Sequence, residues 1–201
     1  MCIHLKTLTI SGLSLIIGMM LNGIAWAYTD DTGVIDGLNQ DVESKSYIDQ
    51  YHFNRWNDHN KNLYGSSDGE VVIYTNGYTN RIFEVFLLGR DYSTDKGIKV
   101  GDSGQNVIKA YGPVYPMSEY DEYDYSLEVN AGRVHTYPAK YYPNYAGYIE
   151  YEYFDSRNSA IYFIINKYTQ KVVLIVYQGN RHGSSDGIWA AKNNGLLPYL
   201  R

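Results

Sequence analysis

β-branched and aromatic residues crowd two neighbouring stretches of the chain, 70–75 and 81–88. Runs of this kind predict β-strands. Between them lies the pair Asn76-Gly77, and such a pair supplies the positive backbone dihedral angles that a tight hairpin requires. We therefore predict an antiparallel hairpin over 70–88.

A short helix is predicted at 103–111, because a start signal and a stop signal flank an apolar face. A tight turn at Gly101 leads to Asp102, the predicted N-cap, and Gln105 returns the capping hydrogen bond. Gly112 with the following proline ends the helix. One face carries Val107, Ile108 and Tyr111. A helix this short is marginal in water, so that face must pack on the sheet.

Five further strands are predicted after the helix, at 125–129, 134–137, 148–154, 160–165 and 172–177. The runs 161–165 and 172–176 are almost continuously apolar, which is typical of strands at the centre of a sheet. The 148–153 run mixes tyrosine and aliphatic residues with acidic ones, so one face of this strand is expected to be exposed to solvent. The predicted fold is α+β, with a strongly twisted antiparallel sheet of about six to seven strands and one packed helix.

The chain divides into four predicted parts: a leader at 1–27, an irregular polar arm at 28–69 with a helical turn or two near 42–53, the α+β domain at 70–178 and a polar tail at 179–201. The leader has Lys6, an apolar stretch at 8–24 and an Ala25-Trp26-Ala27 cleavage pattern. This order is typical of a secretory signal peptide. The alternative, a retained membrane helix, is disfavoured by polar and small residues within the stretch. We expect an extracytoplasmic protein, secreted, periplasmic or at the cell surface.

Cleavage of the leader changes the chemistry of the chain in two ways. It removes Cys2, the one cysteine, so the exported form can make no disulfide. It also removes Lys6 and no acidic residue, so the net charge falls from −5 to −6. This charge argues against nucleic acid as a partner. Stable membrane insertion of the cleaved form is not expected.

The stretch from Gly97 to Pro113 resembles the "GIxVGDSxxxVxxxYGxP" helix of a group of small exported bacterial domains, in which a β-meander follows the helix. It is similar in outline to the domain that precedes secreted CAP modules. More distantly it is similar to SmpA/OmlA-type outer-membrane assembly lipoproteins and to β-lactamase-inhibitor-like units. The resemblance covers about 71–177 and implies a fold but no activity. The lipidated cysteine of the SmpA/OmlA type is missing here.

Tyrosine is the most unusual feature of the composition, with 23 tyrosines against 5 phenylalanines. Twelve of them fall between Tyr111 and Tyr153. A tyrosine ring offers a flat face with a polar tip, which suits sugars, peptides or proteins. The candidate recognition surface is Tyr141, Tyr142, Tyr145 and Tyr148. The alternative is that most tyrosines replace phenylalanine on half-exposed strands.

Histidines and carboxylates do not form a recognisable catalytic or metal motif. The exported form has His52, His59, His135 and His182, and the first two lack the spacing of a helical zinc pair. The neighbours His182, Ser184, Ser185 and Asp186 have the residue types of a hydrolase triad, but a glycine-rich loop cannot give them its geometry. No catalytic residue, metal or cofactor is therefore predicted.

Two groups of acidic residues remain as weaker candidates. The run from Glu119 to Asp124 could offer oxygen ligands to calcium, although a solvated acidic loop fits it better because no EF-hand spacing is present. Glu150 and Glu152 could in principle be the paired carboxylates of a glycoside hydrolase. However, they point to the same face of one strand, and nothing marks them as buried or as having perturbed pKa values.

Together these features predict an exported, non-enzymatic binding module that recognises a protein or glycan of the cell envelope or exterior through tyrosines. The alternative is a small secreted hydrolase acting on a cell-wall or extracellular polymer. An inhibitor-like or architectural protein is a third possibility. A deep pocket with converging His and Asp or Glu side chains would favour the enzyme, whereas a flat aromatic face would favour binding.

Overall fold

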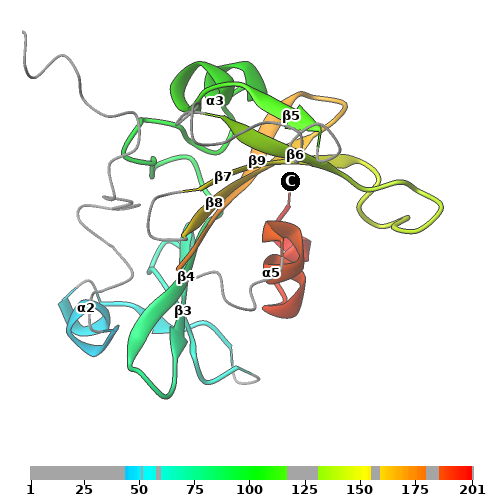
Figure 1. Ribbon diagram of the computed structural model, residues 1–201. Helices are drawn as coiled ribbons and strands as arrows, with labels where there is room; N and C mark the ends of the chain where they lie inside the picture. The colour runs from blue at the N-terminus through cyan, green and yellow to red at the C-terminus, as the bar shows by residue number, and fades with distance from the viewer. Residues whose placement is uncertain are drawn as a thin grey trace, which may run out of the picture.

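The computed structural model describes residues 44–50, 52–57, 60–116, 131–154, 159–179 and 186–200. These residues form one twisted sheet of nine strands in the order β1-β2-β3-β4-β9-β8-β7-β6-β5 (Figure 1). The strands are β1 Asn54–Arg55, β2 Leu63–Gly65, β3 Val71–Asn76, β4 Arg81–Leu87, β5 Val114–Pro116, β6 Gly132–Thr136, β7 Tyr148–Phe154, β8 Ala160–Asn166 and β9 Lys171–Gln178. The helices are α2 Ser44–Gln50, α3 Gly104–Tyr111, α5 Gly187–Asn193 and the 3-10 turn η1 Leu197–Tyr199.

The sheet is larger than the sequence predicts and is mixed rather than wholly antiparallel. It has nine strands instead of six to seven, because β1, β2 and β5 are short and carry little apolar pattern. Its one parallel pairing among the described strands joins β5 to β6. The α+β class is confirmed. The central position of the two most apolar strands is also confirmed, since β9 is the fifth of nine strands and β8 lies beside it.

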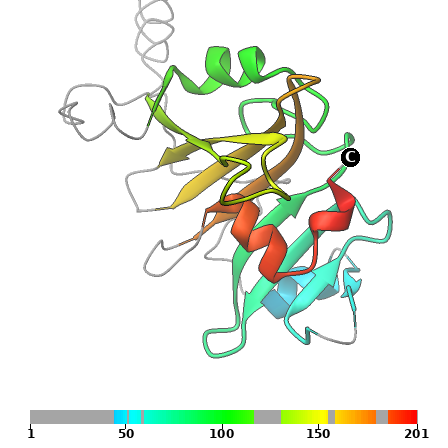
Figure 2. The ribbon, with the colours of Figure 1, turned by 90° about the vertical axis from the view of Figure 1, so that its right-hand side faces the viewer.

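Helices cover both faces of the sheet, which explains why β8 and β9 are apolar on both sides. On one face, α3 packs through Val107 and Tyr111 onto a core that includes Phe163 of β8. On the other face, α5 packs through Ile188 and Ala191. Figure 1 shows α3 and α5 on opposite sides of the sheet, and Figure 2 shows α5 lying across it.

The predicted helix is present as α3, but its N-cap differs from the prediction. Ser103, not Asp102, is the N-cap, and its hydroxyl accepts a hydrogen bond from the Asn106 amide at 3.2 Å. Asp102 instead accepts from the Lys99 amide at 2.9 Å, within the preceding turn. The pairing of Asp102 with Gln105 in a capping box is therefore wrong. The helix ends as predicted at Gly112, whose φ of 102° favours glycine.

The predicted antiparallel hairpin is present as β3 and β4, but Asn76-Gly77 does not supply the positive dihedral angle of its turn. The positive φ falls on Asn80, and the Asn76 side chain accepts from the amides of Tyr78 and Thr79. The β8–β9 turn has the same design, in which Asn166 accepts from Tyr168 and Thr169 and the positive φ falls on Gln170. Both turns depend on an Asn that caps its own loop.

The terminal segments are less irregular than predicted. The arm at 28–69 contains α2, which lies in the stretch where a helical turn is expected. It also contains the unpredicted strands β1 and β2, and β2 extends the sheet by pairing with β3. The supposed tail contains α5, which belongs to the core. The leader, the predicted strand at 125–129 and the acidic run from Glu119 to Asp124 lie outside the described residues. Within the described part of the chain, no helix is long and apolar enough to cross a membrane.

Candidate functional site

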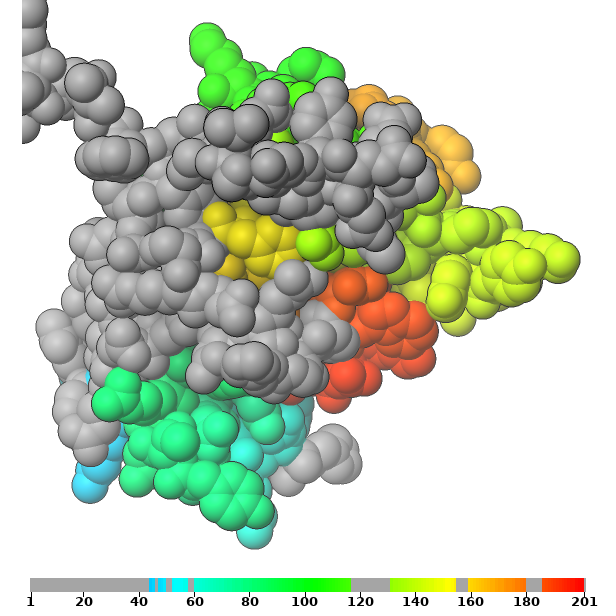
Figure 3. Space-filling view, viewed as in Figure 1, coloured from blue at the N-terminus to red at the C-terminus, as the bar shows by residue number. Residues whose placement is uncertain are grey.

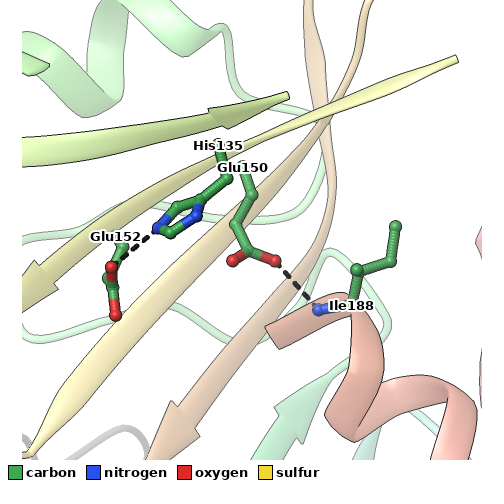
Figure 4. Close-up of polar contacts among 4 residues, drawn as sticks. All are labelled: His135, Glu150, Glu152 and Ile188. Atoms are coloured by element: carbon green, nitrogen blue, oxygen red, sulfur yellow. Dashed lines mark hydrogen bonds and ion pairs between the residues drawn. The ribbon is translucent and has the colours of Figure 1, made fainter. Parts of the chain in front are cut away.

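Strand register brings a histidine and two glutamates together on the face of the sheet that α5 covers. His135 of β6 lies opposite Glu150 of β7 in the antiparallel ladder. Glu152 is two residues further along β7, so it points to the same face. Both glutamates have 0% of their surface exposed. Figure 4 shows the His135 ring between the two carboxyl groups.

A third segment completes the group, because Asp186 lies just before α5. One ligand atom each of His135, Glu150 and Asp186 lies within 4.8 Å of the others. We call these three residues the His–carboxylate cluster. Residues 135, 150 and 186 are far apart in the sequence, so only the β6–β7 pairing and the docking of α5 bring them together.

Hydrogen bonds hold two members of the cluster in place. His135 Nε2 lies 2.7 Å from Glu152 Oε2, and the Ile188 amide donates to Glu150 Oε2 at 2.9 Å (Figure 4). By contrast, Glu150 Oε1 is buried and has no hydrogen-bond partner. The Tyr137 hydroxyl interacts electrostatically with Glu150, but it is buried and has no partner within hydrogen-bonding distance either. Such groups are uncommon in folded proteins and call for an explanation.

Burial, and to a smaller extent the neighbouring charged groups, shifts the pKa values of this site. Burial raises the pKa of Glu150 to about 8, with a smaller contribution in the same direction from the Asp186 charge. Burial alone lowers the pKa of His135, but the Glu152 hydrogen bond and the neighbouring carboxylates outweigh it and raise that pKa overall. Burial, followed by the Glu150 and Asp186 charges, also raises the pKa of the Tyr137 hydroxyl. The site is an electronegative one that favours cations.

A pocket of about 420 Å³ opens beside the cluster. We call it the aromatic pocket, and it is lined by Pro116, Val134, His135, Thr136, Tyr137, Tyr142, Asp186 and Trp189. His135 and Asp186 place polar groups in it, while Glu150 lies behind them. Its walls come from β5, from β6, from the start of α5 and from residues 137–147, which we call the tyrosine loop. In Figure 3 the yellow-green tyrosine loop and the red α5 lie side by side.

Aromatic rings join the tyrosine loop to α5. Trp189 makes edge contacts with Tyr142 at 6.0 Å and Tyr145 at 5.4 Å between ring centroids. Tyr137 makes similar contacts with both tyrosines. Aromatic pairs in this arrangement are worth about 0.5–1.5 kcal/mol beyond the area they bury. They give the pocket a wall that α5 and the loop share.

The four tyrosines proposed from the sequence have different positions. Tyr142 lines the pocket, and Tyr145 is buried behind it. Tyr148 is half-buried and packs on the core beneath α5. Tyr141 is 66% exposed and lies beside Lys140. These tyrosines therefore do not form one flat surface.

The prediction that one face of β7 is exposed to solvent is wrong. Glu150 and Glu152 are buried because α5 covers them and because His135 and the Ile188 amide provide polar partners. Of the four neighbours considered as a triad, the structure describes Asp186 alone, and it places this residue in the cluster. The sequence signal that points to the cluster is a two-residue spacing, which places His135 and Tyr137 on one face of their segment and Glu150 and Glu152 on one face of β7. That signal is readable only once the two strands are known to pair.

A second hollow, of about 840 Å³, lies on another part of the molecule near the start of β9. Its lining includes the exposed side chains Arg90, Asp91 and Lys171. None of the three residues of the His–carboxylate cluster lines it, whereas His135 and Asp186 line the aromatic pocket. The aromatic pocket is therefore the stronger candidate for a functional site.

No protein-family model matches this chain, and neither a curated protein nor a solved structure matches it. The resemblance of the Gly97–Pro113 stretch to exported bacterial domains therefore stays a prediction. The functional argument rests on the geometry of the site.

Proposed function

We propose that the protein is an exported binding module that holds part of a glycan in the aromatic pocket. Export is supported by the leader pattern at 1–27. The observation that carries the proposal is the pairing of aromatic walls, Tyr142 and Trp189, with the polar side chains of His135 and Asp186 in one pocket.

This combination matches the two faces of a sugar ring. The C–H face of a sugar is apolar and packs on an aromatic ring, whereas its hydroxyls require hydrogen-bond acceptors and donors. Ligand pockets in general have mainly apolar walls with a few polar groups that fix orientation. A volume of about 420 Å³ falls within the range usual for small-ligand pockets. A short segment of a longer glycan would fill it.

Replacing Trp189 by alanine should lower affinity for the bound glycan at least tenfold, a loss of about 1.4 kcal/mol. The loss follows from removing one wall of the pocket together with its contacts to Tyr142 and Tyr145. Binding is measured by calorimetry against a panel of oligosaccharides and peptidoglycan fragments. Tyr142→Ala is the second variant, because that side chain is 38% exposed and its removal leaves the core intact.

Tyr168→Ala is the matched control for these pocket variants. Tyr168 is 85% exposed at the β8–β9 turn and does not line the pocket. This variant should bind as the wild type does. If Tyr142→Ala and Trp189→Ala remain folded and also bind as the wild type does, the pocket is not the glycan site. Absence of binding to any glycan in the panel would also count against the proposal.

Hydrolysis of such a polymer is a second candidate function, favoured by the convergence of His135 and Asp186 in the pocket. Either residue is suited to general acid or base work. If the protein is a hydrolase, Asp186→Asn should lower turnover of dye-labelled cell-wall polymer by about 100-fold or more. Tyr78→Ala, which changes a fully exposed tyrosine of the β3–β4 turn, should leave turnover unchanged. Equal turnover by the wild type and Asp186→Asn would exclude this role.

A further inference from the structure

We propose that His135, Glu150 and Asp186 bind a divalent transition-metal ion, with Zn²⁺ the best match, at the floor of the aromatic pocket. The argument does not depend on glycan binding, because it rests on the donor atoms of these three side chains and not on the aromatic walls of the pocket. Four features of the His–carboxylate cluster support it.

The first feature is the donor set and its spacing. One imidazole nitrogen and two carboxylate oxygens lie within 4.8 Å of one another. Zinc binds nitrogen and oxygen at about 2.0–2.2 Å, so tetrahedral ligand atoms lie about 3.4 Å apart. Side-chain rotation on ion binding would have to close this difference. Asp186 is half-buried at the start of α5 and its side chain makes no capping hydrogen bond, so it can make that adjustment.

The second feature is the orientation of the histidine. Its Nε2 is already engaged with Glu152 Oε2 at 2.7 Å, while the other ring nitrogen is on the side of Glu150 (Figure 4). When Nε2 carries the proton, Nδ1 presents a lone pair to the cluster. Metal-binding histidines commonly donate their second N–H to a carboxylate in this way, which fixes the ring and raises its basicity. Glu152 is therefore assigned as the positioning residue for His135.

The third feature is the unpartnered oxygen of Glu150. The residue has no exposed surface, one of its oxygens accepts from the Ile188 amide, and the other has no hydrogen-bond partner. A buried polar atom without a partner costs about 1–3 kcal/mol. A metal ion between Glu150, His135 and Asp186 would provide the missing partner for that oxygen.

The fourth feature is charge. Glu150 and Asp186 each place a carboxyl oxygen within 4.8 Å of a His135 ring nitrogen, and Glu152 Oε2 lies 2.7 Å from His135 Nε2. Both glutamates have no exposed surface. Carboxylates brought this close repel one another unless a proton or a cation lies between them. A divalent ion would offset that repulsion more completely than one imidazolium does.

The imidazole donor separates zinc from the hard cations. Calcium and magnesium prefer sites made of oxygen atoms alone, and calcium takes six to eight of them. A site with one nitrogen and two oxygens suits zinc and its transition-metal neighbours. Since His135 and Asp186 also line the pocket, a fourth position on the ion would face it. Three protein ligands with one open position is the arrangement found in zinc sites that bind a water or a ligand.

The test is calorimetric titration of the chelator-treated full chain with Zn²⁺ alone, with no glycan present. The chain carries Cys2→Ser, because a thiolate is itself a zinc ligand. We expect about one Zn²⁺ per chain, reversal by EDTA, and an increase of several degrees in the unfolding midpoint. Mg²⁺ and Ca²⁺ should produce neither effect. Co²⁺ in place of Zn²⁺ should give visible absorption bands that report the coordination geometry.

Variants distinguish this site from adventitious binding. Asp186→Asn and Glu150→Gln keep the shape of each side chain and should weaken Zn²⁺ binding at least tenfold. Glu152→Gln should weaken it about 10- to 100-fold through the orientation of His135. His52→Ala, which removes an exposed histidine of the α2–β1 turn, should have no effect. If the wild type binds no Zn²⁺, or if folded Asp186→Asn and Glu150→Gln bind it as tightly as the wild type does, the assignment is wrong.

Discussion

Replacing Glu84 by glutamine should remove a pH-dependent loss of stability worth about 3 kcal/mol between pH 4.5 and pH 8. The figure follows from the pKa of Glu84, which burial raises from its usual value of 4.5 to about 7. Each unit of pKa difference between the folded and unfolded states is worth about 1.4 kcal/mol. This is one of the two largest effects on stability that we expect from a single substitution.

The surroundings of Glu84 explain why its proton is retained. The side chain belongs to β4 and is 7% exposed. Its two oxygens accept hydrogen bonds from Gln178 at 3.0 Å and Asn194 at 2.8 Å. Hydrogen bonds from these two amides favour the carboxylate form of Glu84 and lower its pKa. The amides carry no full positive charge, so the effect of burial, which raises the pKa, is larger. Loss of the proton would leave a buried carboxylate without a cation.

The sign of the effect follows from the direction of the shift. Below about pH 4.5 both the folded and the unfolded chain hold the proton, and the full stability is present. Between 4.5 and about 7 the unfolded chain releases the proton while the folded one keeps it, so stability falls as the pH rises. Above about 7 both forms are ionised and the contribution is lost.

The measurement is urea unfolding of the wild type and Glu84→Gln at several pH values from 4.5 to 8. The wild type should lose stability relative to the variant by about 3 kcal/mol over this range. The buried Gln178 Oε1, which has no partner, offers an acceptor for the new amide once the Gln178 side chain flips. Asp49→Asn in α2 is the control for removing a carboxyl group, since Asp49 is exposed. Parallel stability curves for the wild type and Glu84→Gln would contradict the prediction.

Local patterns in the sequence are enough to predict the strands and the helix that form the centre of the fold. The runs at 161–165 and 172–176 are apolar at every position because α3 and α5 cover both faces of β8 and β9. The helix at 104–111 has a clear stop at Gly112 and an apolar face through Val107 and Tyr111. These features depend on neighbours in the chain, so no knowledge of the tertiary structure is needed to predict them.

Features that depend on packing could not be predicted in this way. α5 is seven residues long and starts with glycine, so its helical pattern is too short to recognise. β1 and β2 have two and three residues and become strands only because the edge of β3 is available. The charge of Glu150 and Glu152 suggests a wet face, but α5 and His135 make their burial tolerable. The candidate site cannot be recognised in the sequence, because its residues come from β6, β7 and the start of α5 and only packing brings them together.

The residue on which the site depends most, and which no local pattern indicates, is Gly187. It is the first residue of α5, between Asp186 of the cluster and Ile188, whose amide bonds Glu150. A Cβ atom at this position would lie 2.6 Å from Tyr162 Cβ and 3.2 Å from Glu150 Oε2. Contacts below 3.0 Å are not tolerated by real side chains, so α5 can approach β7 and β8 this closely only with glycine here.

Gly187→Ala should therefore destabilise the protein by about 3 kcal/mol. Overpacking a tight core costs about 1–3 kcal/mol, and loss of the bond to Glu150 adds to that cost. The direction of the stability change separates packing from helix propensity. Alanine is a better helix former than glycine by about 1 kcal/mol, so helix propensity alone predicts that Gly187→Ala stabilises the protein. Urea unfolding compares this variant with Gly77→Ala, whose Cβ would lie 3.6 Å from Asn62 and should change stability little.

The same substitution should weaken the functional site, because α5 carries Trp189 and follows Asp186 directly. A shift of α5 away from Tyr162 separates Asp186 and the Ile188 amide from Glu150, and Trp189 from the tyrosine loop. We expect Zn²⁺ affinity and glycan affinity to fall together in Gly187→Ala at a temperature where it is still folded. Unchanged stability in Gly187→Ala would show that α5 does not lie as close to the sheet as its contacts with Tyr162 and Glu150 require.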